Sequence, residues 1–256
     1  MTTGEFLVPQ EKYLEAGIHI GTKLKTSDMR PFIYKARQDR LFVLDLKKID
    51  ERIRYAARFA ARFDPAGTLV VASRAYAASA AAVFASLTGC RVIAGRFVPG
   101  VFTNPARSDF TEPKLVIVCD PKGERQAVRE AAVMGIPIIA LCDTDNNTKF
   151  VDWIIPCNNK GRKSLALIFY LLARETLKAR GVIASDAEFT TPLEKFEGEE
   201  AEGAPAAEAH VPQPELMAEA EGAKAAPAEG GEEEQKEKEG KRKKAKPEEA
   251  EGGGAG

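Results

Sequence analysis

Residues 135–180 read GIPIIALCDTDNNTKFVDWIIPCNNKGRKSLALIFYLLARETLKAR, and this stretch decides the fold. Two short apolar runs each end at a polar loop, and a long helix rich in apolar residues follows them. The apolar side chains of that helix surround most of its circumference, so the helix needs cover on more than one side. Buried strands followed by a buried helix are typical of a parallel sheet with helices on both faces.

The same alternation runs through the chain before this stretch. We expect strands at 68–73, 90–94 and 114–120, with helices between them at about 74–87 and 123–134. Ahead of these we expect a short helix at 9–16, a hairpin of FIYKAR and LFVLDL, and a helix at about 47–63. The sequence therefore predicts a doubly wound α/β fold, in which residues 1–64 and 65–183 belong to one globular unit.

Charge divides the chain near residue 183. Residues 1–183 hold 28 Lys and Arg against 18 Asp and Glu, net +10, whereas residues 184–256 hold 9 against 20, net −11. The first part is long enough to bury a core, and its positive charge favours a polyanionic partner such as nucleic acid. The second part is mostly Ala, Glu, Gly, Lys and Pro, without an aromatic residue after Phe196, so we expect a disordered tail at 184–256.

The sequence also argues against a secreted or membrane protein. The N-terminus lacks the apolar core of a signal peptide, and the longest apolar run, residues 165–173, is far shorter than the roughly 20 residues of a membrane span. We therefore expect a soluble, cytoplasmic protein with no membrane partner. The cysteines show no CxxC spacing, and we interpret them as buried reduced thiols; they are Cys90, Cys119, Cys142 and Cys157.

The expected strand ends carry polar residues that an enzyme of this fold could use. Ligands bind doubly wound sheets beyond the carboxyl ends of the strands. Here these ends carry Ser73, Arg74, Asp120, Asp143 and Asp145. The alternative function is therefore a nucleotide- or phosphosugar-binding enzyme that uses Asp143 and Asp145 with a metal. Against it, the chain has neither a GxxxxGK(S/T) loop nor a GxGxxG motif that opens a helix after a strand.

Basic residues form three clusters that fit the phosphate backbone of RNA. One lies on the helix at 47–63, where arginines at every fourth position share a stripe in which we expect no acidic side chain. A second lies in the polar loop at 21–30, where hydroxyl and backbone N–H groups can join the basic side chains on phosphate oxygens. The candidate RNA-binding residues of these two clusters are Arg54, Arg58, Arg62, Lys23, Lys25 and Arg30.

The third cluster lies at the start of the long helix of the opening stretch. Asn158 or Asn159 can cap this helix, and the basic side chains surround its positively polarised end. Each cation there is unfavourable by roughly 0.3–1 kcal/mol against the helix dipole, so a bound phosphate would relieve a penalty. The candidate RNA-binding residues of this cluster are Lys160, Arg162 and Lys163.

Seven long motifs follow one another in an order that is specific to one family. They are AGIHIGT (16–22), DMRPFIYKAR (28–37), RLFVLDLKKIDERI (40–53), GRFVPGVFTNP (95–105), EPKLVIVCDP (112–121), GIPIIALCDTDN (135–146) and VDWIIPCNNKGRKSLALIFYLLARE (151–175). Together they cover nearly all of residues 9–181. In these motifs the chain resembles the ribosomal protein S2 family of the small subunit, and specifically its archaeal and eukaryotic branch, which includes eukaryotic ribosomal protein SA.

The resemblance implies a flavodoxin-like fold with five parallel strands that binds small-subunit rRNA near the head–body junction. It also implies neighbouring ribosomal proteins as partners, and no catalysis, cofactor, metal or small-molecule substrate. Bacterial members resemble the chain less, because they insert a long helical hairpin between the equivalents of Thr103 and Glu112. Contacts made through that hairpin are therefore not transferred. Charge and resemblance together predict a structural, rRNA-binding component of an archaeal-type small ribosomal subunit.

Overall fold

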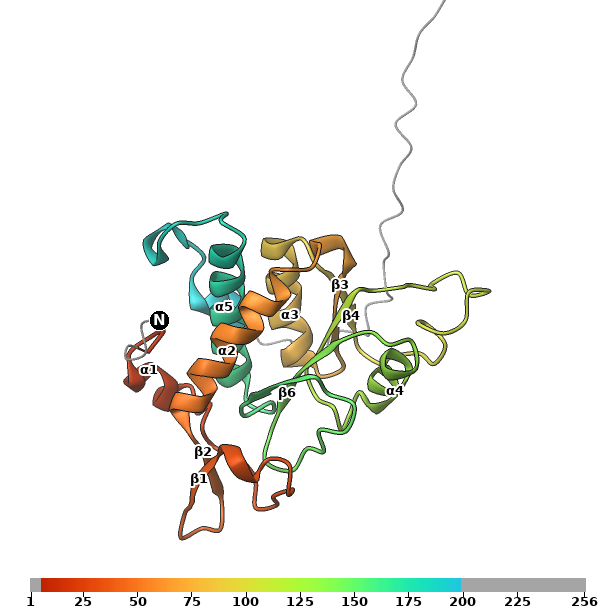
Figure 1. Ribbon diagram of the computed structural model, residues 1–256. Helices are drawn as coiled ribbons and strands as arrows, with labels where there is room; N and C mark the ends of the chain where they lie inside the picture. Colours follow the sequence, from red (N-terminus) through yellow and green to blue (C-terminus); the bar gives the residue numbers. More distant parts are fainter. Residues whose placement is uncertain (1–5, 199–256) are drawn as a thin grey trace, which may run out of the picture. The chain divides into compact units, whose positions relative to one another are not determined.

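Figure 1 shows the computed structural model, which describes residues 6–198. The strands are β1 (Ile33–Ala36), β2 (Phe42–Leu44), β3 (Thr68–Ala72), β4 (Arg91–Ala94), β5 (Leu115–Val118), β6 (Ile138–Cys142) and β7 (Trp153–Pro156). The helices are α1 (Gln10–Glu15), α2 (Leu46–Ala60), α3 (Ala75–Thr88), α4 (Arg125–Val133), α5 (Arg162–Ala179) and α6 (Leu193–Glu197), with 3-10 turns at Arg30–Phe32, Pro65–Gly67 and Asp186–Glu188. Each helix and strand expected from the sequence is present, with small differences at the ends.

Five strands form one parallel sheet in the order β4-β3-β5-β6-β7. β3 pairs with β4 on one side and β5 on the other, so that Val70 lies beside both Val92 and Ile117. Every residue of β3, β5 and β6 is buried, as expected of strands that are covered on both faces. The strand order confirms the flavodoxin-like arrangement that the resemblance implied.

Helices cover both faces of this sheet. The connections β3-α3-β4 and β5-α4-β6 run in opposite directions across it, so right-handed crossovers place α3 and α4 on opposite faces. α5 packs against α2 and α3 (Figure 1), and the ring centroids of Phe169 in α5 and Phe84 in α3 lie 5.7 Å apart. Twelve residues of α5 are buried, which confirms that it is covered on more than one side. Within residues 6–198, none of the helices is long and apolar enough to cross a membrane.

The hairpin of β1 and β2 is extended by the chain that precedes it. Leu44 N donates to His19 O at 2.8 Å, and Ile20 bridges to the middle of β2. Gly21 N donates to the carbonyl of the first β2 residue at 2.9 Å. A Cβ at Gly21 would lie 2.5 Å from Thr144 Cγ2, so only glycine fits between the hairpin and the loop after β6. The basic loop at 21–30 therefore begins at a fixed point.

Residues 184–198, which we assigned to the tail, pack on the body instead. Phe196 of α6 is 1% exposed and its ring centroid lies 5.9 Å from that of Tyr170 in α5. Phe189 lies 5.2 Å from the same tyrosine ring, and α6 also contacts α3. The predicted start of the tail at residue 184 was wrong because these two phenylalanines bury apolar surface against the body. The acidic composition of the segment around them does not indicate this burial. The rest of the predicted tail, residues 199–256, lies outside the described residues.

The four cysteines are free thiols, and their burial differs. Cys119, Cys142 and Cys157 are buried, which confirms their interpretation as small apolar side chains, whereas Cys90 is half-buried. Burial raises the pKa of all three buried thiols, so they stay protonated and unreactive near neutral pH.

Candidate nucleic-acid interface

Proteins of this fold bind ligands at the switch point of the sheet, which here lies between the carboxyl ends of β3 and β5. That position is filled by Glu124, which is 2% exposed. Its carboxylate accepts hydrogen bonds from three backbone N–H groups, those of Ser73 (2.7 Å), Cys119 (2.9 Å) and Asp120 (3.1 Å). These are donors of the kind that a bound phosphate uses. Burial raises the pKa of Glu124 to about 7. A side chain of the protein itself therefore occupies the ligand position.

Asp120, at the end of β5, joins the loops that follow four strands. Arg74 Nη2 lies 2.5 Å from its Oδ2. Asn146 Nδ2 donates to Oδ1 at 2.9 Å, and Asn159 Nδ2 reaches the same oxygen at 3.5 Å. Burial disfavours the ionised form, but the hydrogen bonds from Asn146 and Arg74 outweigh it and hold the pKa of Asp120 below its usual range. This carboxylate therefore holds the loops after β3, β5, β6 and β7 together.

Asp143 and Asp145, the metal ligands of the alternative enzyme function, bind lysines of this chain. Lys160 Nζ lies 3.2 Å from an oxygen of each carboxylate. Lys122 Nζ lies 3.2 Å from the second oxygen of Asp145. Burial raises the pKa of Asp143, whereas at Asp145 the two lysines outweigh burial and lower the pKa. Among the residues that the structure describes, no three His, Cys, Asp or Glu side chains gather as a metal site would require.

The basic cluster at the start of α5 is partly neutralised by the protein. The helix has Gly161 at its N-cap, so neither asparagine is the cap that we expected; Asn158 Oδ1 instead accepts from the backbone N–H groups of Lys160 and Gly161, at 3.0 and 3.2 Å. Lys160 is held by the two aspartates, and Arg162 Nη2 lies 3.8 Å from a carboxylate oxygen of Glu197. Lys163 is exposed. The cluster therefore offers one fully solvated cation and two that have acidic partners.

The basic loop at 21–30 lies against the loop that follows β6. Thr22 N donates to Thr144 Oγ1 and Thr26 N donates to Thr144 O, both at 2.9 Å. The hydroxyl of Thr26 donates to Asn146 O. We expected these threonine groups to bind phosphate, but they instead hold the loop in place by hydrogen bonds within the protein. The basic side chains of the loop are exposed; they are Lys23, Lys25 and Arg30. Because Thr144 lies between the aspartates that bind Lys160, the second and third clusters meet at one edge of the sheet.

The arginine stripe on α2 does contain an acidic side chain, contrary to our expectation. Asp50, which is 6% exposed, lies one turn before Arg54 and its Oδ2 accepts from Arg54 Nε at 2.8 Å. The other oxygen accepts from Leu7 N at 2.8 Å and from Tyr13 OH at 2.7 Å, which fastens the N-terminal segment to α2. Arg54 thus takes part in a structural network. The stripe continues with two exposed arginines, Arg58 on α2 and Arg62, which lies in the turn after α2 and not on the helix as we expected.

The hairpin adds basic residues that our candidate set did not include. Three of the four β1 residues are exposed, among them Lys35, and Arg40 is exposed in the turn with a positive φ of 61°. Lys25 of the neighbouring loop lies 5.0 Å from the ring centroid of Phe42 in β2, so loop and hairpin form one surface. The signal in the sequence was the hairpin itself, a two-stranded element whose first strand and turn carry three cations, Lys35, Arg37 and Arg40.

Comparison of the sequence with known proteins shows which family the chain belongs to. The family model described as Ribosomal protein S2 matches residues 13–111 and 106–179. The chain belongs to the ribosomal protein S2 family. The match confirms the resemblance that the seven motifs indicated, and it spans the loop at 21–30, the stripe on α2 and the start of α5.

Curated S2-family proteins from archaea are similar to most of the chain. The small ribosomal subunit protein uS2 of Thermofilum pendens is 56% identical over 194 residues, which is 76% of this chain and 91% of that protein. The uS2 proteins of Staphylothermus marinus and Thermoplasma acidophilum are 50% and 51% identical, over 75% and 76% of this chain and 88% and 98% of their own lengths. The chain is therefore a member of the archaeal type.

Proposed function

We propose that this protein is a structural constituent of the small ribosomal subunit in the cytoplasm. It binds small-subunit rRNA, near the head–body junction as the resemblance implies, and contacts neighbouring ribosomal proteins. The observation that carries the proposal is the identity of 50–56% with archaeal small-subunit proteins over 88–98% of their lengths. It is not an enzyme, since the S2 family is a structural, non-catalytic family.

The exposed part of the candidate set supports the proposal for rRNA. Six of the nine candidates are exposed and available to phosphates, and the other three have acidic partners within the protein. If all six neutralised phosphates, the logarithm of the binding constant would fall with the logarithm of salt concentration with a slope of about −4 to −5. Among the described residues, the exposed candidates without an acidic partner are Lys23, Lys25, Arg30, Arg58, Arg62 and Lys163.

The occupied switch point argues against the alternative enzyme. A nucleotide would have to displace Glu124 from three backbone N–H groups, and a metal would have to displace Lys160 from Asp143 and Asp145. Displacing Glu124 would leave its buried carboxyl group without a partner, which is unfavourable by about 1–3 kcal/mol. The polar residues at the carboxyl ends of the strands thus hold the loops of the protein together by hydrogen bonds and ion pairs.

Sedimentation tests the proposed function. Purified full-length protein, mixed with small subunits that lack it, should sediment with them at low salt and dissociate as salt rises. Thermal unfolding in the presence of nucleotides with magnesium or manganese tests the alternative, because a ligand that binds the folded state must raise its stability. Free sedimentation at low salt, or a raised unfolding temperature with a nucleotide, would contradict the proposal.

A further inference from the structure

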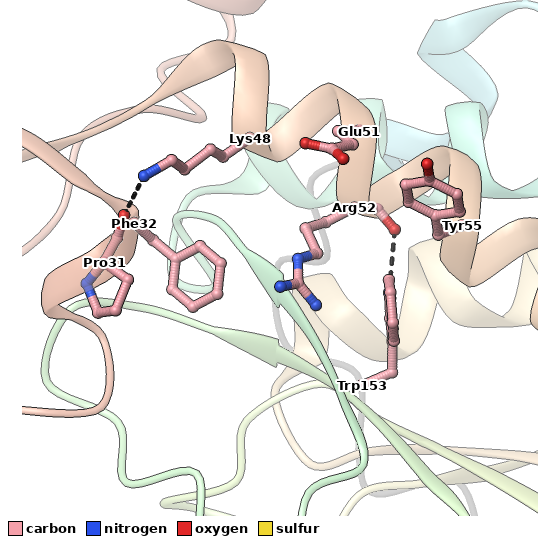
Figure 2. Close-up of a pocket in the computed structure, with 7 residues that line it drawn as sticks. All are labelled: Pro31, Phe32, Lys48, Glu51, Arg52, Tyr55 and Trp153. Atoms are coloured by element: carbon pink, nitrogen blue, oxygen red, sulfur yellow. Dashed lines mark hydrogen bonds between the residues drawn. The ribbon is translucent and has the colours of Figure 1, made fainter. Parts of the chain in front are cut away.

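The side chain of an arginine on α2 lies between two aromatic rings in a surface pocket (Figure 2). The guanidinium carbon of Arg52 is 4.5 Å from the ring centroid of Trp153, the first residue of β7, and 5.2 Å from that of Phe32. Trp153 Nε1 donates to Arg52 O at 3.1 Å, and Tyr55 packs edge-on against Trp153 with centroids 5.9 Å apart. The backbone bond and the two rings together fix where the guanidinium lies.

The hydrogen-bonding edge of this guanidinium is open. Within the described part of the chain, Arg52 has no ion pair, and its side-chain N–H groups have no hydrogen-bond acceptor. Arg54, two residues along the same helix, is paired with Asp50. The pocket that Arg52 faces has a volume of about 270 Å³, which is room for several water molecules or one larger group. It is lined by Pro31, Phe32, Lys48, Glu51, Arg52, Tyr55 and Trp153.

The chemistry of the pocket selects a planar or tetrahedral anion. Guanidinium presents its N–H donors as a rigid fork that matches two oxygens of a phosphate or carboxylate, and here it lies between the rings of Phe32 and Trp153. A cation already held in place loses less conformational entropy when it binds. Lys48 adds a second positive charge, its ammonium donating to Pro31 O, and the exposed Glu51 adds one negative charge at the rim.

We propose that Arg52 binds a backbone phosphate of RNA in this pocket. The inference rests on the proposed function and extends it to a residue outside the three basic clusters. RNA fits better than an acidic protein segment for two reasons. The pocket is carried by the most basic part of the chain, residues 12–62 with a net charge of +7. The half-exposed ring of Tyr55 also offers a face on which a base next to the phosphate can stack.

Binding to full-length small-subunit rRNA, measured across a range of salt concentrations, tests the inference. Arg52→Gln should weaken binding about tenfold at 0.1 M salt and reduce the salt slope by about 1, because one charge-assisted phosphate contact is lost. Arg52→Lys keeps the charge without the fork, so it should weaken binding while it preserves the slope. Arg129→Gln removes an exposed arginine from α4, on the opposite face of the sheet, and should leave both quantities unchanged.

A second variant tests the site without altering Arg52 or the aromatic rings beside it. Glu51→Gln removes the exposed carboxylate at the rim and should strengthen RNA binding by about two- to threefold, an effect that added salt reduces. Fluorescence of Trp153, the single tryptophan of the chain, reports whether each variant keeps the surroundings of this ring unchanged.

The outcomes separate this inference from the proposed function. If the unaltered protein shows no salt-dependent rRNA binding, the proposed function itself fails. If it binds but the Arg52 and Glu51 variants behave like Arg129→Gln, the pocket does not hold a phosphate. If the Arg52 variants bind naked rRNA normally but are lost from assembled subunits, the acceptor is a carboxylate of a neighbouring protein, which also overturns the inference.

Discussion

Asp50→Ala should lower the free energy of unfolding and at the same time strengthen RNA binding. The carboxylate is 6% exposed and accepts from Tyr13 OH at 2.7 Å, from Leu7 N at 2.8 Å and from Arg54 Nε at 2.8 Å. Its removal leaves the fully buried tyrosine hydroxyl without an acceptor, at about 1–3 kcal/mol. The ion pair with the partly exposed Arg54 adds only about 0.5 kcal/mol. The hydrogen bond from Leu7 N is lost as well, so we expect Asp50→Ala to lower the free energy of unfolding by about 2–4 kcal/mol in total.

Equilibrium unfolding in guanidinium chloride, followed by Trp153 fluorescence, measures this loss. Tyr13→Phe should be far less harmful in the Asp50→Ala background than in the unaltered protein, because the hydroxyl has already lost its partner; we expect a coupling of about 1–2 kcal/mol. Asp39→Ala, an exposed aspartate in the hairpin turn, is the control and should change stability by less than about 0.5 kcal/mol. A loss below 1 kcal/mol at Asp50, or strictly additive double variants, would refute the reasoning.

The effect on RNA follows from the same carboxylate. Asp50 is the acidic side chain within the arginine stripe, so its removal raises the net charge of α2 by one. The salt slope of rRNA binding should then become steeper by about 1 at temperatures where the variant stays folded. An unchanged slope would show that the stripe does not contact phosphates near Arg54.

Three further predictions follow from other parts of the structure. Gly21→Ala should destabilise the protein by about 1–3 kcal/mol in thermal unfolding, because the added Cβ would lie 2.5 Å from Thr144 Cγ2; unaltered stability would mean that the loop can move aside. Glu124 releases its proton near pH 4.5 in the unfolded chain and near pH 7 in the folded chain, so the free energy of unfolding should fall by about 3 kcal/mol as pH rises from 4.5 to 7. Glu124→Gln should abolish this dependence. If the free energy of unfolding changes equally with pH in both proteins, the assignment to Glu124 is contradicted. Lys163→Glu should reduce occupancy in gradient-purified subunits, whereas Arg129→Glu should not; equal occupancy would remove Lys163 from the interface.

The fold could be predicted from local patterns because each element has a short-range signal. Apolar runs such as residues 138–142 and turn residues between them locate the strands, and the apolar circumference of α5 required burial. The strand order needed the resemblance, since local patterns do not say which strands pair. The start of the tail was predicted wrongly because residues 184–198 have no clear short-range signal. Two phenylalanines, the buried Phe196 and the half-buried Phe189, are too few to change a composition dominated by charged and small residues.

The site was less predictable because pairing in space decides which cations remain available. The pair of Asp50 and Arg54 has the four-residue spacing of neighbours on a helix and could have been recognised. The bonds of Lys160 to the loop after β6 depend on how two strands pair in the sheet. The stack of Arg52 on Trp153 joins residues 101 positions apart, and no local pattern indicates it.

The position of Glu124 has a consequence for how the protein meets its partners in the cell. A fold that requires a small ligand gains stability only as the concentration of that ligand rises above its dissociation constant. Here the carboxyl group at the switch point belongs to the chain itself, so its effective concentration there is fixed and does not follow the supply of nucleotide or phosphate. The stability of the unassembled protein therefore does not depend on the concentration of a small ligand at this position. In the proposed function, the anions that this protein binds are therefore the phosphates of RNA, and they bind to the basic clusters on its surface.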